Sequence, residues 1–203
     1  MYALVEDNNI IQFINQPKSI VVGDVRYPAK IFELWSQSEK EAIGIYEVIT
    51  DATNYKDPHY YNNTNEQYTF ADGQVTKSWG TATAKRLEDE NAVDEDGNNI
   101  LDENGNQLIN YGLKTEKKRI VKQQASGLLS PTDWYVVKAT EVADYSVPAN
   151  ITTFRADVRT KSNEMETMID NCTTVDELKA LYEYTEQEDG TITRPLPEFP
   201  EEI

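Results

Sequence analysis

Two acidic turns stand eight residues apart in the chain, as Asp94-Glu-Asp-Gly-Asn-Asn-Ile100 and Asp102-Glu-Asn-Gly-Asn-Gln-Leu108. Clustered carboxylate and amide oxygens are ligands that Ca²⁺ prefers, so calcium binding is one interpretation of this repeat. The EF-hand pattern fails, because Asn99 occupies the position that needs glycine and no glutamate closes the loop. Two consecutive turns joined by a short strand at Ile100-Leu101 explain the same residues more simply. We therefore predict no metal site and leave calcium open as the alternative.

The chain has one histidine and one cysteine, which narrows the catalytic schemes that it can support. His59 lies in a polar loop, where it is either a metal ligand beside Asp57 or, as we prefer, an exposed side chain. Cys172 has no second cysteine with which to form an internal disulfide. No phosphate-binding glycine loop, Cys-x-x-Cys pair, His-Glu-x-x-His helix or Gly-x-Ser-x-Gly elbow is present. A glycosidase-type carboxylate pair is allowed by 36 acidic residues, but nothing singles one out. We predict no catalytic and no cofactor-binding residues.

The net charge of −17 is concentrated in two segments. Residues 162–203 hold twelve acids and two bases, and residues 87–107 hold eight acids and no base. A chain this acidic repels phosphate backbones, so we expect no nucleic-acid partner. We also expect no membrane contact, because no apolar run approaches the roughly 20 residues that span a bilayer. The acidic surface serves either solubility or docking to a basic partner.

The segment 113–129 is the exception to this acidic balance. Its apolar residues recur at helical spacing, and its bases are Lys114, Lys117, Lys118, Arg119 and Lys122. Three interpretations of the basic face remain open. It is solvated, it pairs with acidic segments of this chain or a neighbour, or it binds acidic lipid or nucleic acid. We prefer the first two.

These features lie in a chain that the sequence predicts to be α+β, with strands first and helices later. Residues 1–112 should be rich in β-hairpins, at 2–14, 20–27 and 67–79, with a strand at 45–49 and the acidic turns at 94–107. Asp-Gly at 72–73 is the strongest of the hairpin signals. One short helix is expected at Ser38 to Ile43, where Ser36 with Glu39 and Ser38 with Glu41 both fit a capping box.

Residues 113–185 should form a helical module. We expect helices at 113–129, from Pro148 to Ile169, and after Thr174, whose capping partner is Glu177. Ser130-Pro131 should break the first helix. The apolar run from Trp134 to Val137 should be a strand or loop packed among the helices. Residues 186–203 should be an extended, acidic, proline-rich tail that needs a partner to be ordered.

Large aromatic residues are the candidates for core or interaction sites. Trp134 follows a chain break and Phe154 lies on an apolar helix face, so we predict both to be buried core anchors. Tyr55, Tyr60 and Tyr61 either form a contact surface or cover a sheet edge. The full set of candidates is Trp35, Tyr60, Tyr61, Trp79, Trp134, Tyr135, Phe154 and Phe199.

The order of parts between residues 128 and 159 resembles a C-terminal module of tailed-bacteriophage tail proteins. The parts are Leu-Leu at 128–129, Thr-Asp-Trp-Tyr-Val-Val at 132–137, Val-Pro at 147–148 and Phe-Arg-Ala-x-Val-Arg at 154–159. The module is found in tail-fibre-associated and tail assembly proteins. A shorter resemblance to N-terminal modules of phage tail proteins joins Trp-Ser-x-Ser-Glu at 35–39 to Gly-Ile-Tyr-x-Val at 44–48.

The resemblance implies a non-enzymatic virion structural protein, that is, a tail-fibre, baseplate or adaptor subunit. Its expected partners are other phage tail proteins and further copies of itself, with a homotrimer preferred. It would be made in the bacterial host cytoplasm and end in the virion tail. One alternative is a tail-fibre assembly chaperone that is absent from the mature virion. A second alternative is a tail enzyme that degrades surface polysaccharide.

Overall fold

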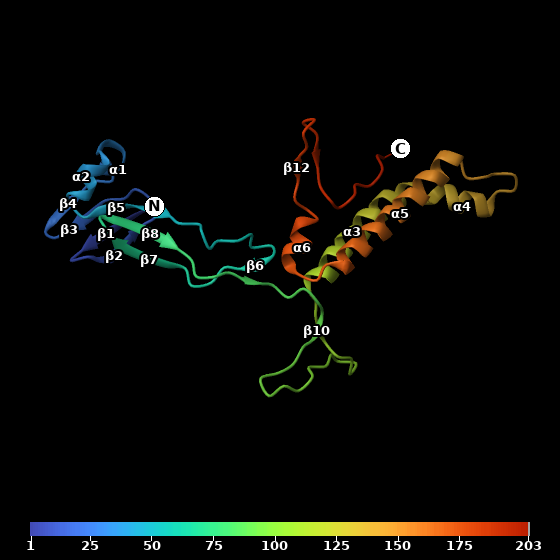
Figure 1. Ribbon diagram of the computed structural model, residues 1–203, viewed down its shortest axis with the longest axis horizontal. Coiled ribbons are helices and arrows are strands. Elements are labelled where there is room, and N and C mark those ends of the chain that lie inside the picture. Colours follow the sequence, from blue (N-terminus) through green and yellow to red (C-terminus); the bar gives the residue numbers. More distant parts are fainter. Residues whose placement is uncertain (203) are drawn as a thin grey trace. The chain divides into compact units, whose positions relative to one another are not determined.

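The structure, a computed structural model, describes residues 1–202 and confirms the α+β fold class. The chain divides into two compact units, Met1–Thr83 and a second unit that begins at Ala84. Strands are the main elements of the first unit, and long helices are the main elements of the second (Figure 1). The division therefore lies 29 residues before the position predicted from the sequence, at 83 instead of 112.

The first unit is built on a five-stranded sheet with the strand order β2-β1-β5-β8-β7. All neighbouring pairs are antiparallel except β5 and β8, which are parallel. Both predicted hairpins of this sheet form, because Asp7-Asn8 and Asp72-Gly73 adopt the positive φ angles that tight turns need. The strands are β1 (Tyr2–Glu6), β2 (Asn9–Ile14), β5 (Ile45–Thr50), β7 (Gln67–Ala71) and β8 (Gln74–Ser78).

Apolar side chains alternate between the two faces of this sheet, so each face has its own core. Ala3, Val5 and Val75 form the core on one face. Leu4 and Ile45 belong to the core on the other face, which is covered by the third hairpin and by two short helices. The covering elements are β3 (Ile20–Val22), β4 (Val25–Tyr27), α1 (Ile31–Leu34) and α2 (Gln37–Glu41). Two further short strands, β6 (Tyr61–Asn62) and β9 (Thr83–Ala84), pair in a separate sheet.

The helix predicted at Ser38 to Ile43 forms one residue earlier, as α2. Ser36 is its N-cap, and the Ser36–Glu39 capping box is present in both directions. Ser38 lies inside the helix, so the second predicted box does not form. The preceding turn of helix, α1, was not predicted. It places the Leu34 side chain at 74% exposure.

The second unit is a helical hairpin with a short helix at each end. In Figure 1, α3 (Leu113–Leu129) and α5 (Ala149–Asn171) lie side by side. Their core includes Ala125 from α3 with Phe154 and Val158 from α5. Both helices lie within two residues of the predicted bounds. The unit also contains the 3₁₀ turn η1 (Ser130–Thr132), α4 (Asp133–Glu141) and α6 (Val175–Ala180), with the predicted Thr174–Glu177 capping box.

The prediction for Trp134 is wrong in two respects. The segment that begins at Trp134 is the helix α4, not a strand or loop, and the Trp134 side chain is 51% exposed. The helix continues from the 3₁₀ turn, so its outer face points into solvent and not toward the α3–α5 core. Phe154 is buried as predicted, with 6% exposure.

The C-terminal segment packs on its own chain. After the hairpin of β12 (Thr185–Glu186) and β13 (Ile192–Thr193), the chain returns to the helices, and the Leu196 N–H donates to the Leu181 carbonyl at 2.9 Å. Leu196 is 2% exposed, and Phe199 packs against the cluster of Ala125, Phe154 and Val158. The expectation that this tail needs a partner to be ordered is therefore wrong.

Residues 90–110 form a projecting ribbon that we call the arm, between β10 (Glu90–Asn91) and β11 (Ile109–Asn110) (Figure 1). Both predicted acidic turns are present. Between them, three backbone hydrogen bonds close a ring: Ala92 N–H to Leu108 O, Leu108 N–H to Ile100 O, and Ile100 N–H to Ala92 O, at 2.8–2.9 Å. The ring explains the repeat, because its members are eight residues apart.

The arm belongs to the second unit because the segment before it, residues 85–89, is hydrogen-bonded to the start of α3. The N–H groups of Leu113 and Lys114 donate to the carbonyls of Arg86 and Leu87. These bonds satisfy backbone donors of the first helical turn that have no partner within the helix. They also explain why the unit boundary lies before this segment and not at residue 112.

Candidate functional site

One exposed apolar surface of the helical unit is on α4. Trp134, Val136, Val137 and the following Val142 are all at least 40% exposed, and we call these four residues the α4 surface. None of the nine residues of α4, all of them described, is buried. An isolated helix of this length is marginal in water, so contacts outside the helix must hold it. Large exposed apolar side chains on one short helix make α4 a candidate interaction site.

One buried arginine holds α4 in place. Nη1 of Arg155, on α5, donates to the Leu129 carbonyl at 3.0 Å and to the Thr132 hydroxyl at 2.5 Å, and it lies 2.8 Å from the Asp133 carboxylate. A buried charge is tolerated only when it is paired and hydrogen-bonded. Arg155 meets this condition with the last carbonyl of α3, the turn and the first residue of α4. The direction in which α4 leaves the hairpin is thus fixed by α5.

The aromatic residues of the α4 region are ordered by one another and by a lysine. The ring centroids of Trp134 and Tyr135 are 3.8 Å apart. The Lys138 ammonium lies 5.7 Å from the Trp134 ring centroid and 4.3 Å from that of Tyr145. Tryptophan and tyrosine are the residue types most often found at energetic hot spots of protein interfaces. The α4 surface therefore offers a rigid aromatic anchor to a partner.

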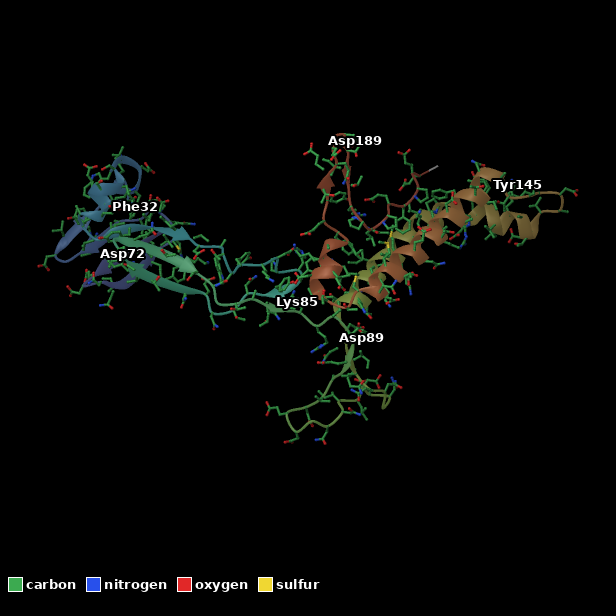
Figure 2. The ribbon with its side chains drawn as sticks, viewed as in Figure 1. Phe32, Asp72, Lys85, Asp89, Tyr145 and Asp189 are labelled. Atoms are coloured by element: carbon green, nitrogen blue, oxygen red, sulfur yellow. The ribbon has the colours of Figure 1, made fainter. Side chains whose placement is uncertain are left out.

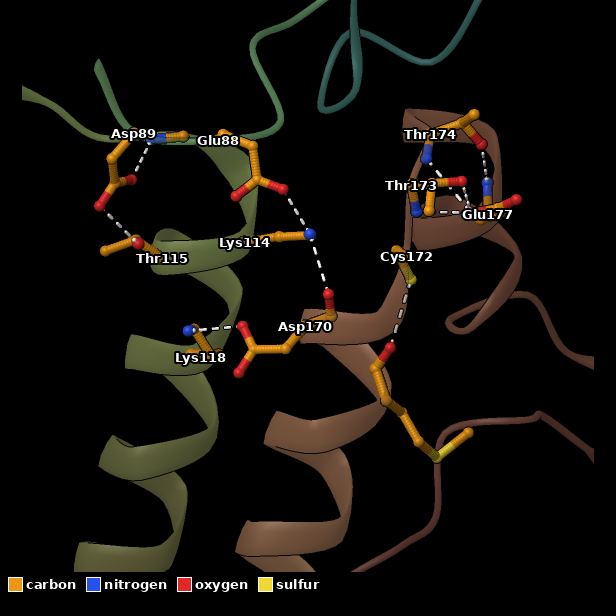
Figure 3. A network of polar contacts seen from close by, with 12 residues as sticks. Glu88, Asp89, Lys114, Thr115, Lys118, Asp170, Cys172, Thr173, Thr174 and Glu177 are labelled. Carbon is orange, nitrogen blue, oxygen red and sulfur yellow. Dashed lines mark hydrogen bonds and ion pairs between the residues drawn. The ribbon is translucent and has the colours of Figure 1, made fainter.

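A second polar network fixes the base of the arm, and Figure 3 shows its members. Glu88 is paired with Lys114, whose ammonium also donates to the Asp170 carbonyl at 2.9 Å. Asp89 accepts from the Gly112 N–H at 2.7 Å and from the Thr115 hydroxyl at 2.9 Å. A Cβ on residue 112 would meet the Glu88 backbone at 2.5 Å, so only glycine allows this approach.

A row of bases lies along one side of α3 and α5. We call Lys118, Arg119, Lys122 and Arg159 the basic strip. It borders a hollow of about 590 Å³ on α3, which begins at Tyr111, and continues into a second hollow of about 440 Å³ between the helices. Lys118 pairs with Asp170 at 2.7 Å, which raises the pKa of Lys118. Within residues 1–202, Arg119 and Arg159 form no ion pair with a carboxylate. The basic face predicted for 113–129 is thus partly paired and partly open.

The remaining aromatic candidates of the first unit are Trp35, Tyr60, Tyr61 and Trp79. Trp35 packs on the sheet core and meets Tyr27 edge-on, with ring centroids 5.6 Å apart. Tyr60 and Tyr61 are buried, so the alternative that they form an open contact surface is wrong. Trp79 lies against Tyr55, with the Lys77 ammonium 4.8 Å from its ring centroid.

The single histidine and the single cysteine lie in different units of the chain. His59 Nδ1 lies 2.9 Å from Asp57 Oδ1 in an exposed loop. Cys172 is buried, and desolvation raises the pKa of its thiol, which disfavours the reactive thiolate. Among the residues that the structure describes, no three histidine, cysteine or acidic side chains are arranged to hold a metal, and no helix is long and apolar enough to cross a membrane.

The acidic turns use their carboxylates internally. Asp94 Oδ1 accepts from the N–H groups of Asp96 and Asn98, and Asp102 Oδ1 accepts in the same way from Asn104 and Asn106. Hydrogen bonds from the backbone and side chain of Asn98 lower the pKa of Asp94, and those from Asn106 lower the pKa of Asp102. This geometry accounts for the turn residues without a bound cation.

Comparisons with protein-family models, with curated proteins and with solved structures find no match to this chain. Sequence reasoning identified Trp134 and Tyr135 as candidates but missed Arg155. A signal was available, because Arg155 interrupts the apolar face of α5 that Ile151, Phe154 and Val158 define. A charged residue at the edge of such a face needs a partner.

Proposed function

We propose that this protein is a non-enzymatic structural subunit of a bacteriophage tail, and that it binds a neighbouring tail protein through the α4 surface. The observation that carries the proposal is that α4 contributes no buried side chain of its own yet is held by the buried Arg155. Burying the charge of Arg155 costs free energy, yet the helix that it positions keeps its aromatic and aliphatic side chains in solvent. Such a helix is suited to bind a partner. The resemblance of residues 128–159 to phage tail proteins includes this same helix and the arginine that positions it.

The structure suggests how the parts would divide this work. The first unit has its own two-sided core, and the second supplies a rigid helical hairpin that presents α4. Trp134 is the expected anchor, since a large aromatic side chain in the centre of an interface contributes more binding energy than its neighbours. Val137 and Val142 would surround it and exclude water.

The test begins with mass spectrometry of purified phage particles, which should contain the chain. A phage that carries Trp134→Ala with Val137→Ala should then incorporate at least about tenfold less of it, as expected when a hot spot is removed. The matched control is Val21→Ala with Leu34→Ala, which removes exposed apolar side chains from the first unit and should leave incorporation unchanged.

The same experiment separates the proposal from its nearest alternative. An assembly chaperone would be missing from the particles although fibre assembly depends on it, and that result would replace the structural role. Loss of surface polysaccharide on incubation with the purified protein would instead support the enzyme alternative. Equal incorporation of both double variants would leave the chain in the tail but refute the role of the α4 surface.

A further inference from the structure

The arm has many exposed apolar side chains and almost no core. Ala92 is the single buried residue between positions 90 and 110. Val93, Leu101 and Ile109 occupy equivalent positions of the eight-residue repeat, and all three are exposed. A ribbon this small is marginal in water unless its apolar side packs on another surface. The arm therefore requires a further packing surface.

The charge of the arm indicates what kind of surface that is. Residues 87–107 hold eight acids and no base. Glu95, Asp96 and Glu103, at the tips of the two turns, form no ion pair within residues 1–202. A partner surface for the arm must therefore combine apolar area with positive charge.

The basic strip has this combination. Lysine and arginine carry a charged head on a long aliphatic stem, so the two hollows that they line offer apolar area and positive charge together. Arg119 and Arg159 have no carboxylate partner in the described part of the chain. The strip is the positive counterpart of the arm in a protein whose overall charge is −17.

The arm cannot lie on the strip of its own chain. Its base is fixed against the start of α3 by Asp89, by Glu88 with Lys114, and by the close approach at Gly112. From this base the arm projects away from α3 and α5, as Figure 1 and the side-chain view in Figure 2 show. A second copy of the chain can present its arm to the strip without this restriction.

We propose that two copies of this protein associate by docking the arm of each on the basic strip of the other. The tip carboxylates Glu95, Asp96 and Glu103 face the bases of the strip, and the apolar side chains of the arm cover the lysine and arginine stems. Because every copy carries both surfaces, the exchange closes as a pair related by a twofold axis. The proposal does not depend on a role in a phage tail.

The test is sedimentation velocity of the full chain at rising protein concentration. The wild-type chain should form a dimer at low ionic strength, and its dissociation constant should rise at least about tenfold between roughly 0.05 M and 0.5 M salt, because screening weakens the charged contacts. The arm variant Glu95→Lys, Asp96→Lys, Glu103→Lys and the strip variant Arg119→Glu, Lys122→Glu should each remain monomeric. Circular dichroism melts confirm that both variants are folded.

Mixing the two variants gives the decisive result. The arm variant retains a basic strip for the acidic arm of the strip variant, and the three lysines introduced into its own arm face the two glutamates introduced into the other strip. The mixture should therefore form a one-to-one complex that neither variant forms alone. Lys18→Glu with Lys30→Glu, which changes the net charge by as much as the strip variant does, should dimerise like the wild type.

Several outcomes would overturn the proposal. They are a wild-type chain that stays monomeric at low salt, a dimer that both variants still form, and a mixture that stays monomeric. Loss of the dimer in the strip variant alone would mean that the strip binds an acidic surface other than the arm.

Discussion

At the scale of single residues, Trp134 and Phe154 were both predicted to be buried, but only Phe154 is. The two side chains should therefore contribute differently to the free energy of unfolding. Trp134→Ala should lower the free energy of unfolding by less than about 1 kcal/mol, as for other exposed positions. Phe154→Ala should lower it by about 3–5 kcal/mol, because it leaves a cavity in the α3–α5 core. Urea denaturation of the two variants makes the comparison. A large loss for Trp134→Ala would mean that α4 packs on the protein after all.

Arg155 should matter more to stability than any other arginine of α5. Arg155→Ala leaves the Leu129 carbonyl and the Thr132 hydroxyl without their charged donor, so we expect a loss of about 2–4 kcal/mol. Amide hydrogen exchange should show faster exchange in α4 than in α3. Arg159→Ala, one turn further along α5 and exposed, is the matched control and should change stability by less than about 0.5 kcal/mol.

At the scale of elements, the arm should be ordered by its two turn aspartates in a pH-dependent way. The pKa values of Asp94 and Asp102 lie below the ordinary value of 3.8 because the folded turns donate hydrogen bonds to the carboxylates. Their contribution to order is therefore fully present above the ordinary pKa and is lost as the pH falls through the lowered value. NMR of the Asn98 and Asn106 amides should show the arm loosening on acidification.

The matched control for this pH effect is Asp94→Asn with Asp102→Asn. The asparagine carbonyl can accept the same N–H bonds but does not titrate in this range. The double variant should keep its turns at neutral pH and show no loosening on acidification. Persistence of the acid transition in this variant would assign it to other groups.

The C-terminal segment also differs from its prediction, because it packs on its own chain. Leu196→Ala should cost about 2–4 kcal/mol of unfolding free energy, since the side chain is nearly fully buried. Glu201→Ala, exposed in the same segment, should cost less than about 0.5 kcal/mol in the same thermal or urea unfolding experiment. Equal effects of the two would show that the segment is not docked.

Local signals account for what the sequence predicted among these elements. Asp7-Asn8 and Asp72-Gly73 specify their hairpins within a few residues, and the apolar periodicity of α3 and α5 specifies two long helices. The run Trp134 to Val137 was wrongly predicted to be a strand or loop, because aromatic and β-branched residues favour strands. Its helix depends on Arg155, about twenty residues further along the chain. Contacts that distant leave little trace in local composition.

At the scale of the whole molecule, the position of the unit boundary makes a prediction about fragments. The segment 85–89 accepts backbone hydrogen bonds from the start of α3 at Arg86 and Leu87, and Glu88 pairs with Lys114 there. A fragment of residues 84–203 keeps these contacts and should fold alone, with cooperative unfolding followed by circular dichroism. A fragment of residues 113–203 exposes the first N–H groups of α3 and the partly buried Lys114, so it should unfold at a temperature several degrees lower, about 4–8 °C for each kcal/mol lost. Equal melting temperatures would show that segment 85–89 and the arm do not stabilise the helices, and would support a unit boundary at residue 112.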